Sequence, residues 1–175
     1  MCFLVNLMIY LITGASHTGK TFYAQKLLEK YKYPYLSIDH LKMGLIRSGN
    51  TDLTPLSDHK QLTDYLWPIV CEMIKTAIEN KQNLIVEGCY VPLDWASNFK
   101  KEYLDDIRFR CLIMTEYYIK NNFEKIKNNA NIVEKRLYND VTIDELIENN
   151  KSYLKFSKIY PDNIILFDYE YKLYI

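Results

Sequence analysis

Five short apolar runs recur along the chain, and longer stretches with helical spacing separate them. The runs are LMIYLIT (7–13), YPYLSI (33–38), NLIVEG (83–88), IRFRCLIM (107–114) and NIILFD (163–168). Their length and near-continuous Leu, Ile and Val content favour strands that are covered on both faces. Strands alternating with helices indicate an α/β protein built on a parallel sheet.

Three of the intervening stretches have apolar residues at helical spacing, namely 20–32, 58–80 and 142–160. Pro68 lies inside the second stretch and predicts a kink or the start of a new helix at that point. The third begins with Thr142 and has Glu145 three positions later, which is the pattern of a capping box. The polar, Asn/Lys-rich region 120–136 has the weakest core signal, and we interpret it as a candidate lid.

Composition narrows the class of protein. A chain of 175 residues that is 49% hydrophobic suits one well-buried core, so we expect a single domain over residues 1–175. Lys plus Arg and Asp plus Glu number 22 each, and the formal net charge is zero. No global basic field exists to attract a nucleic-acid backbone, which disfavours nucleic acid as a partner. Both a monomer and a homodimer remain compatible with these numbers.

The cysteines and the N-terminal segment bear on location. Four cysteines occur without CxxC spacing and mostly within apolar runs, which favours buried thiols in a reducing compartment over disulfides or a zinc site. The apolar segment 1–13 has no basic flank and no small-residue cleavage site, and it is too short to span a bilayer as a helix. We therefore expect a cytoplasmic protein without a membrane partner.

The octapeptide GASHTGKT, residues 14–21, directly follows the first apolar run and precedes an amphipathic stretch. The pattern GxxxxGK[ST] binds phosphate because its glycines let backbone N–H groups converge on phosphate oxygens, while the lysine reaches the outer phosphates. The positive end of the following helix adds to this attraction. We predict that the whole loop binds ATP, with the hydroxyl of Thr21 on Mg²⁺; the alternative is an ordinary strand-to-helix turn. The predicted nucleotide-binding residues are Gly14, Ala15, Ser16, His17, Thr18, Gly19, Lys20 and Thr21.

Together with LSIDH after the second run and LIVEG in the third, this loop resembles the P-loop kinases of the nucleoside-monophosphate-kinase type. Shikimate kinase, chloramphenicol phosphotransferase, the zeta toxins and the kinase domain of phage polynucleotide kinase have a similar pattern. The resemblance implies a three-layer fold with a five-stranded parallel sheet of order 2-3-1-4-5 and helices on both faces. It also implies MgATP as the phosphoryl donor and a small acceptor beyond the carboxyl ends of the strands.

Asp39 directly follows the second apolar run, where a carboxylate would point into the crevice that binds ligands in open α/β sheets. We predict that Asp39 accepts the proton of an acceptor hydroxyl or positions that hydroxyl. Capping the helix that follows is the structural alternative, and the two roles are compatible. In the resembling families an arginine somewhat later grips the acceptor, and Arg47 stands in a suitable place.

Glu87 ends the third run and is predicted to contact Mg²⁺ or the acceptor, or else to be a strand-end acid that faces water. Gly88 would let a ligand approach the backbone, and Tyr90 lies in the aromatic loop that follows. The chain has four arginines, of which Arg108 and Arg110 begin the fourth run, roughly 15 Å or more from its carboxyl end. That leaves Arg136 as the predicted catalytic arginine of the lid.

A phosphate loop is also compatible with functions other than that of a kinase. A GTPase requires NKxD after a later strand, but the similar NKQN at 80–83 lacks the aspartate and precedes the third run. A regulatory module or NTPase that uses no acceptor remains the chief alternative to an ATP-dependent small-molecule kinase. A phosphotransferase acting on nucleic-acid ends or cell-wall sugars is a further alternative.

Overall fold

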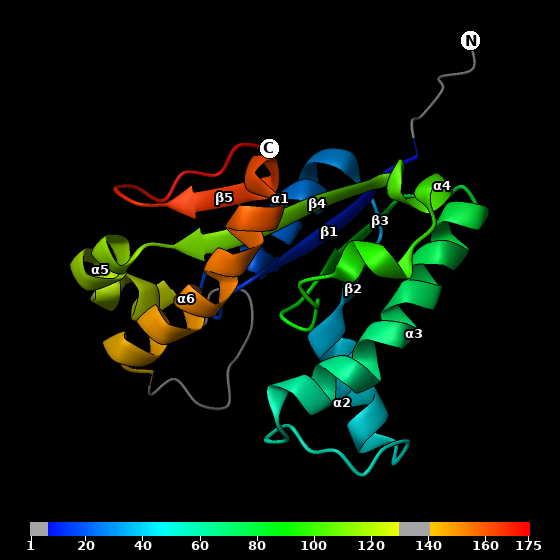
Figure 1. Cartoon of the computed structure of the whole chain (residues 1–175), viewed down its shortest axis with the longest axis horizontal. Helices are drawn as coiled ribbons and strands as arrows, with labels where there is room; N and C mark the ends of the chain where they lie inside the picture. Colours follow the sequence, from blue (N-terminus) through cyan, green and yellow to red (C-terminus); the bar gives the residue numbers. More distant parts are fainter. Residues whose placement is uncertain (1–6, 130–140) are drawn as a thin grey trace.

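The computed structural model describes residues 7–129 and 141–175, and Figure 1 shows their arrangement. The sheet crosses the molecule, with α5 and α6 near one end and α2 and α3 near the other (Figure 1). In chain order the elements are β1 (Ile9–Gly14), α1 (Lys20–Tyr31), β2 (Tyr35–Ser37), α2 (Ile38–Arg47), α3 (His59–Glu79), β3 (Leu84–Glu87), η1 (Trp95–Asn98), α4 (Lys101–Leu104), β4 (Ile107–Met114), α5 (Glu116–Asn129), α6 (Ile143–Ile159), η2 (Pro161–Asn163) and β5 (Ile164–Phe167).

The strands form one five-stranded sheet of order β2-β3-β1-β4-β5, and every neighbouring pair is parallel. The five predicted strands and their predicted order are confirmed. Because all strands run the same way, their carboxyl ends share one edge of the sheet. The segments that follow β1, β2 and β3 therefore begin at that edge, and they contain most of the predicted site residues.

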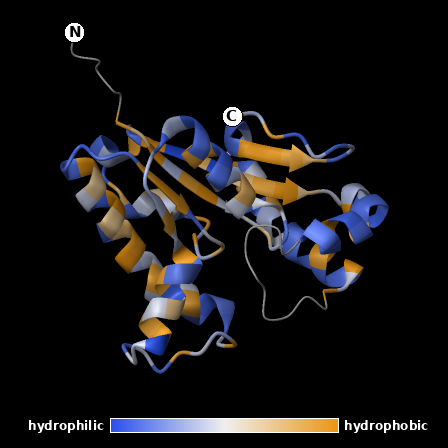
Figure 2. Cartoon of the chain, turned by 180° about the vertical axis from the view of Figure 1, so that it is seen from behind, coloured by the Kyte–Doolittle hydropathy of each residue, from blue (hydrophilic) through white to orange (hydrophobic). Residues whose placement is uncertain are grey.

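Side chains of the central strands alternate between two buried faces. On β1, Ile9 and Leu11 join the cluster covered by α3, whereas Ile12 joins the cluster covered by α1 and α5. The central strands are accordingly mostly apolar, whereas the helices alternate hydrophobic and hydrophilic residues (Figure 2). This double covering produces the predicted three layers.

Two helix predictions have opposite outcomes. Helix α6 begins with the predicted capping box, in which Thr142 accepts from the backbone N–H of Glu145 and the Glu145 carboxylate accepts from the N–H of Thr142. Helix α3, however, continues through Pro68 without a break, so the expectation of a new helix there is wrong. The proline costs one backbone hydrogen bond, and the buried residues on both sides of it hold the helix together.

The proposed lid falls only partly within the described residues. Residues 120–129 belong to α5, where Ile126 is buried and Asn122 has non-helical backbone angles. Residues 130–136 lie outside the described ranges. None of the helices in the described parts of the chain is long and apolar enough to cross a membrane.

Candidate functional site

The phosphate loop joins β1 to α1, and its backbone requires glycine at both conserved positions of the motif. Gly14 has φ +141° and Gly19 has φ +82°, which are conformations that other residues rarely adopt. A Cβ at Gly14 would also overlap the backbone carbonyl of Leu112 on the neighbouring strand β4. The two glycines thus let the chain turn sharply at the end of β1 and enter α1.

Side chains inside the loop stabilise this turn. The Thr18 hydroxyl and the Lys20 ammonium both donate to the carbonyl oxygen of Ala15, each at 2.8 Å. His17 adopts φ +66° and its Nδ1 lies 3.0 Å from the hydroxyl of Ser16. His17 is half-buried and is thus part of the folded loop.

The first turn of α1 suits an anionic ligand. Its N-cap is Gly19, which has no side chain that could satisfy the N–H groups of the turn, so these remain for a ligand. No described residue is hydrogen-bonded to the Thr21 hydroxyl, and Lys20 lies at the same helix start. The residues present therefore fit a phosphate chain with Mg²⁺ on Thr21.

Tyr171 packs against this loop, and sequence reasoning did not identify it. Its ring stacks on Phe167 at a centroid distance of 4.3 Å, and its hydroxyl lies 3.4 Å from the carbonyl oxygen of Thr18. A Cβ at Gly19 would overlap that hydroxyl. Nothing in the sequence near Tyr171 indicates this contact, because it depends on how the segment after β5 returns toward α1.

Asp39 lies in the first turn of α2, at the carboxyl end of β2. Ser37 is the N-cap, and its hydroxyl accepts from the N–H of His40, so the alternative that Asp39 caps the helix is wrong. Instead, Asp39 Oδ1 accepts from Lys42 Nζ at 2.5 Å, one turn further along the helix. Its negative charge also suits the positive end of α2.

Lys42 connects Asp39 to the loop after β3, and this residue too was missed by sequence reasoning. Its ammonium donates to the Tyr90 hydroxyl at 2.9 Å and lies 4.9 Å from the centre of the Tyr90 ring. His59, at the start of α3, stacks on the same ring at 5.1 Å. Side chains from α2 and α3 therefore both contact Tyr90 of the loop after β3. Helical spacing pairs Lys42 with Asp39, but the sequence does not indicate that Tyr90 joins them.

Burial sets the protonation of this cluster. It raises the pKa of Tyr90 to about 12, so the phenol stays neutral. Burial alone would lower the pKa of Lys42, but the nearby Asp39 carboxylate outweighs that effect, so the pKa of Lys42 is raised. Burial of one ring face lowers the pKa of His59, and the nearby Lys42 ammonium adds to that effect.

Glu87 is 2% exposed at the end of β3, so the alternative that it is a strand-end acid facing water is wrong. Its Oε1 accepts from the Tyr35 hydroxyl at 2.7 Å, and its backbone pairs with Ile12 on β1 and Ser37 on β2. Glu87 therefore lies between the strand that carries the phosphate loop and the strand that precedes Asp39. A buried carboxylate at this edge of the sheet has the chemistry to hold a cation.

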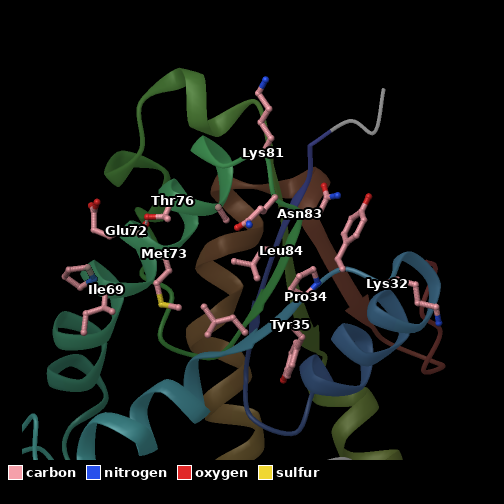
Figure 3. A pocket seen from close by; sticks show the side chains of 15 residues that line it. Lys32, Pro34, Tyr35, Ile69, Glu72, Met73, Thr76, Lys81, Asn83 and Leu84 are labelled. Carbon is pink, nitrogen blue, oxygen red and sulfur yellow. Dashed lines mark hydrogen bonds between the residues drawn. The ribbon is translucent and has the colours of Figure 1, made fainter. Parts of the chain in front are cut away.

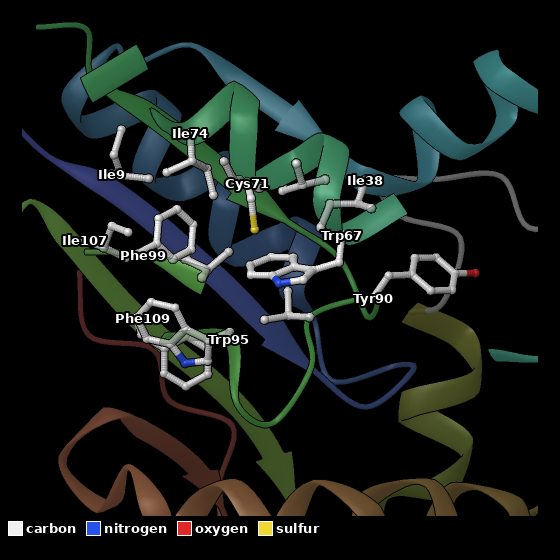
Figure 4. Packing of buried hydrophobic residues seen from close by; sticks show 14 of the residues in the cluster. Ile9, Ile38, Trp67, Cys71, Ile74, Tyr90, Trp95, Phe99, Ile107 and Phe109 are labelled. Carbon is white, nitrogen blue, oxygen red and sulfur yellow. The ribbon is translucent and has the colours of Figure 1, made fainter. Parts of the chain in front are cut away.

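Gly88 has a packing reason for its missing side chain. A Cβ there would approach the Cβ of Ile38 at 2.7 Å, because α2 starts directly beside the end of β3. Tyr90, two residues later, is 6% exposed and closes one end of the buried cluster against α3, where Figure 4 shows its hydroxyl directed away from the packed side chains. Trp95 of the same loop stacks on Phe109 at 5.0 Å and belongs to the core.

The three arginines within the described ranges lie away from Asp39. Arg47 is exposed at the end of α2, eight residues beyond Asp39 and so about 12 Å further along the helix axis. Arg108 and Arg110 lie near the amino end of β4, and their guanidinium groups donate to the carbonyls of Asp105 and Phe109. Arg136 falls outside the described residues.

A groove of about 1190 Å³ opens elsewhere on the molecule (Figure 3). It lies between α3, the chain that enters β2 and the turn that enters β3, and thus at the amino ends of these strands. None of the predicted site residues lines it. Its wall is formed by Lys32, Tyr33, Pro34, Tyr35, Leu36, Pro68, Ile69, Glu72, Met73, Thr76, Ala77, Lys81, Gln82, Asn83 and Leu84.

The fold is similar to those of two solved proteins. A gluconokinase from Sinorhizobium meliloti 1021 matches at a TM-score of 0.53, over 93% of this chain and 83% of its own, with 12% identity. A protein from Chloroflexus aurantiacus j-10-fl that is proposed to be a kinase matches at 0.51, over 93% and 88%, with 13% identity. The sequence matches no protein-family model and no curated protein. With the strand order above, these likenesses show the fold of the P-loop kinases of the nucleoside-monophosphate-kinase type.

Proposed function

We propose that this protein is an ATP-dependent kinase that transfers the γ-phosphoryl group of ATP to a hydroxyl of a small acceptor. The observation that carries the proposal is the loop from Gly14 to Thr21, whose two glycines hold left-handed backbone and whose helix start has no side-chain cap. This geometry is that of a phosphate-binding loop. Similarity to solved kinases supports the same interpretation through the fold.

The residues around the loop divide the work. Lys20 would contact the outer phosphates, and Thr21 with Glu87 would hold Mg²⁺, directly or through water. The metal would neutralise phosphate charge as it develops on the leaving group. Arg136 and the region 120–136 stay a proposal for the lid that excludes water on closure.

Asp39 is proposed to act on the acceptor. The acceptor oxygen forms a new bond to the γ-phosphorus, while the bond from that phosphorus to the bridging oxygen breaks and its electrons leave on ADP. The acceptor proton passes to the Asp39 carboxylate, which stands at the same carboxyl edge of the sheet as the phosphate loop, with β3 between their strands. Gly88 and Tyr90 complete the proposed acceptor side, whereas Arg47, about 12 Å further along α2, would reach only a more distant part of an acceptor.

Calorimetry with MgATP on the Lys20→Ala variant tests the proposal. A hydrogen bond between charged groups contributes about 1.5–3 kcal/mol, so the affinity should fall by roughly tenfold to a hundredfold. Lys26→Ala is the matched control, because Lys26 lies on the same helix in an exposed pair with Glu29 and should leave binding unchanged. Equal MgATP affinity in the Lys20→Ala variant and the wild type would end the kinase proposal.

Turnover separates a kinase from a nucleotide-binding module without an acceptor. A kinase should produce ADP faster when its acceptor is added, and the Lys20→Ala variant should lose that increase. ATP binding that depends on Lys20, combined with slow hydrolysis that no hydroxyl compound accelerates, would instead favour the regulatory module.

A further inference from the structure

Asp39 and Lys42 present one open acceptor atom and one open donor side by side at the start of α2. Lys42 Nζ has three N–H donors, and two of them are used, on Asp39 Oδ1 and on the Tyr90 hydroxyl. Asp39 Oδ2 has no hydrogen-bond partner among the described residues, and the carboxylate side chain is 38% exposed. A ligand at this point would therefore meet a carboxylate oxygen and an ammonium together.

The pair is held rigidly for a surface ion pair. The Lys42 side chain is only 12% exposed and its ammonium lies over the Tyr90 ring, on which His59 also stacks. Tyr90 itself is buried, so its hydroxyl gives Lys42 a fixed partner on a different element. Such anchoring lowers the cost of ordering a long side chain when a ligand binds.

The charge of this site argues against a phosphate-bearing acceptor. The negative charge of Asp39 and the positive charge of Lys42 cancel one another. Tyr90 and His59 are uncharged at neutral pH. Recognition of a phosphate monoester calls for arginines or lysines without a carboxylate partner. Within residues 7–129 and 141–175, Arg47 lies about 12 Å along α2 from Asp39. Arg108 and Arg110 lie on β4, which is separated from β2 by β3 and β1, and both guanidinium groups donate to nearby backbone carbonyls.

We propose that Asp39 and Lys42 form a two-point subsite for vicinal hydroxyls, so that the acceptor is a polyhydroxylated small molecule rather than a nucleoside monophosphate. One hydroxyl donates to Asp39 Oδ2 and is the group phosphorylated, and the neighbouring oxygen accepts from Lys42. Lys42 is thus a positioning residue, held by Tyr90. The inference rests on the proposed kinase function and specifies its acceptor.

The test compares two sets of probes with MgATP and full-length protein, and ADP formation is measured. One set contains glycerol, glucose, gluconate and inositol, and the other contains AMP, CMP, GMP and UMP. We expect acceptor-dependent ADP formation with a member of the first set and none with the nucleotides. Turnover of the nucleotides, or of neither set, would overturn the assignment of the acceptor class.

Variants then test the two named residues. Lys42→Met keeps the length of the apolar stem and removes the ammonium, so the KM for the accepted probe should rise at least tenfold. MgATP affinity and the unfolding midpoint should stay near wild type. Asp39→Asn should lower kcat by roughly a hundredfold to ten-thousandfold. Lys60→Met is the matched control, because Lys60 forms an exposed ion pair with Asp64 and should change neither constant.

The outcomes separate this inference from the proposed function. An unchanged KM in the Lys42→Met variant would remove Lys42 from the acceptor site even if the protein is a kinase. If the wild type does not bind MgATP more tightly than the Lys20→Ala variant does, the kinase proposal itself is overturned. The Tyr90→Phe variant should raise the same KM by a smaller factor, and no change there would show that Tyr90 does not anchor Lys42.

Discussion

The donor side and the acceptor side of the proposed active site are built differently. On the donor side, the backbone sets the geometry: Gly14 and Gly19 adopt conformations that side chains forbid, and neighbouring atoms leave no space for a Cβ. On the acceptor side, side chains set the geometry, because Lys42 joins Asp39 on its own helix α2 to Tyr90 on the loop after β3. A site shaped by the backbone has its ligand specified by the motif alone. The ligand of a site shaped by side chains can be changed by single substitutions.

This difference suits a fold that keeps one donor and serves many acceptors. The donor loop cannot be altered without strain on β1 and α1, which also support the sheet. The acceptor cluster rests on the start of α2, the start of α3 and the loop after β3, and a change in one side chain there leaves the sheet intact. Substitutions on the two sides should therefore differ in whether they affect folding or only recognition.

The largest expected effect is that of Gly14→Ala on the donor side. The new Cβ would meet the backbone of Leu112 on β4, which cannot move without breaking the sheet. With the strain of φ +141°, the free energy of unfolding should fall by about 3 kcal/mol or more, and MgATP binding should be lost. Urea denaturation and calorimetry measure the two effects.

Gly44→Ala is the control for that experiment. Gly44 lies inside α2, and a Cβ there would meet no atom within 4 Å. Alanine is the better helix former, so this variant should gain about 0.5–1 kcal/mol of stability. Two glycine variants of equal stability would contradict the view that the donor loop is fixed by its backbone.

The second effect concerns Glu87, on the strand between the two sides. In Tyr35→Phe the buried carboxylate loses the hydroxyl that donates to Oε1, so the free energy of unfolding should fall by about 1–3 kcal/mol. Tyr33→Phe is the matched control two residues earlier, because the described residues include no hydrogen-bond partner for its hydroxyl. A cost of equal size in both variants would mean that the Tyr35 contact does not stabilise Glu87.

A double-mutant cycle at Gly19 and Tyr171 gives the third effect. Gly19→Ala should be destabilising both through its φ of +82° and through the Tyr171 hydroxyl, which occupies the place of the new Cβ. Tyr171→Phe removes the hydroxyl, so Gly19→Ala should cost roughly 1 kcal/mol less in that background. Strict additivity of the two substitutions in urea denaturation would show that Tyr171 does not restrain the loop.

Sequence reasoning succeeded where local pattern determines structure. The runs around Ile9–Gly14 and Ile107–Met114 gave the central strands, and the octapeptide from Gly14 gave the loop, because each depends on neighbouring residues alone. Asp39 was placed correctly at the strand end, but the cap that was considered as its alternative role is provided by Ser37. One residue of offset decides which side chain caps a helix, and the apolar pattern does not fix the boundary that closely.

The missed contacts have a shared physical cause. Lys42 and Tyr90 are 48 positions apart, and the Tyr171 and Thr18 contact spans 153. Such pairs depend on how α2 is set against β3 and on where the chain goes after β5. The sequence left open whether Glu87 serves a ligand or faces water, and it did not indicate that the Tyr35 hydroxyl on β2 donates to this carboxylate. No periodicity in the sequence contains that information.

The smallest predicted effect is a pH dependence that starts from His59 on the acceptor side. The groups around its ring are Asp58 and Thr63 on its own helix, Cys89 and Tyr90 on the loop, and Lys42 and Asp39 on α2. Burial, helped by the Lys42 ammonium, lowers the pKa of His59 below its ordinary value near 6.5. As pH falls below about 6.5, the unfolded chain therefore takes up a proton before the folded protein does.

Folding stability from this group is accordingly full above pH 6.5 and declines as pH falls through the folded-state pKa. The ring keeps an exposed face, so the loss should stay under about 1 kcal/mol. Proton NMR titration should give a pKa of His59 below 6.5 in the wild type and a higher one in Lys42→Met, since the ammonium that opposes protonation is gone. An identical pKa in the two proteins would mean that His59 does not sense Lys42, and the side-chain cluster of the acceptor side would then reduce to Asp39, Lys42 and Tyr90.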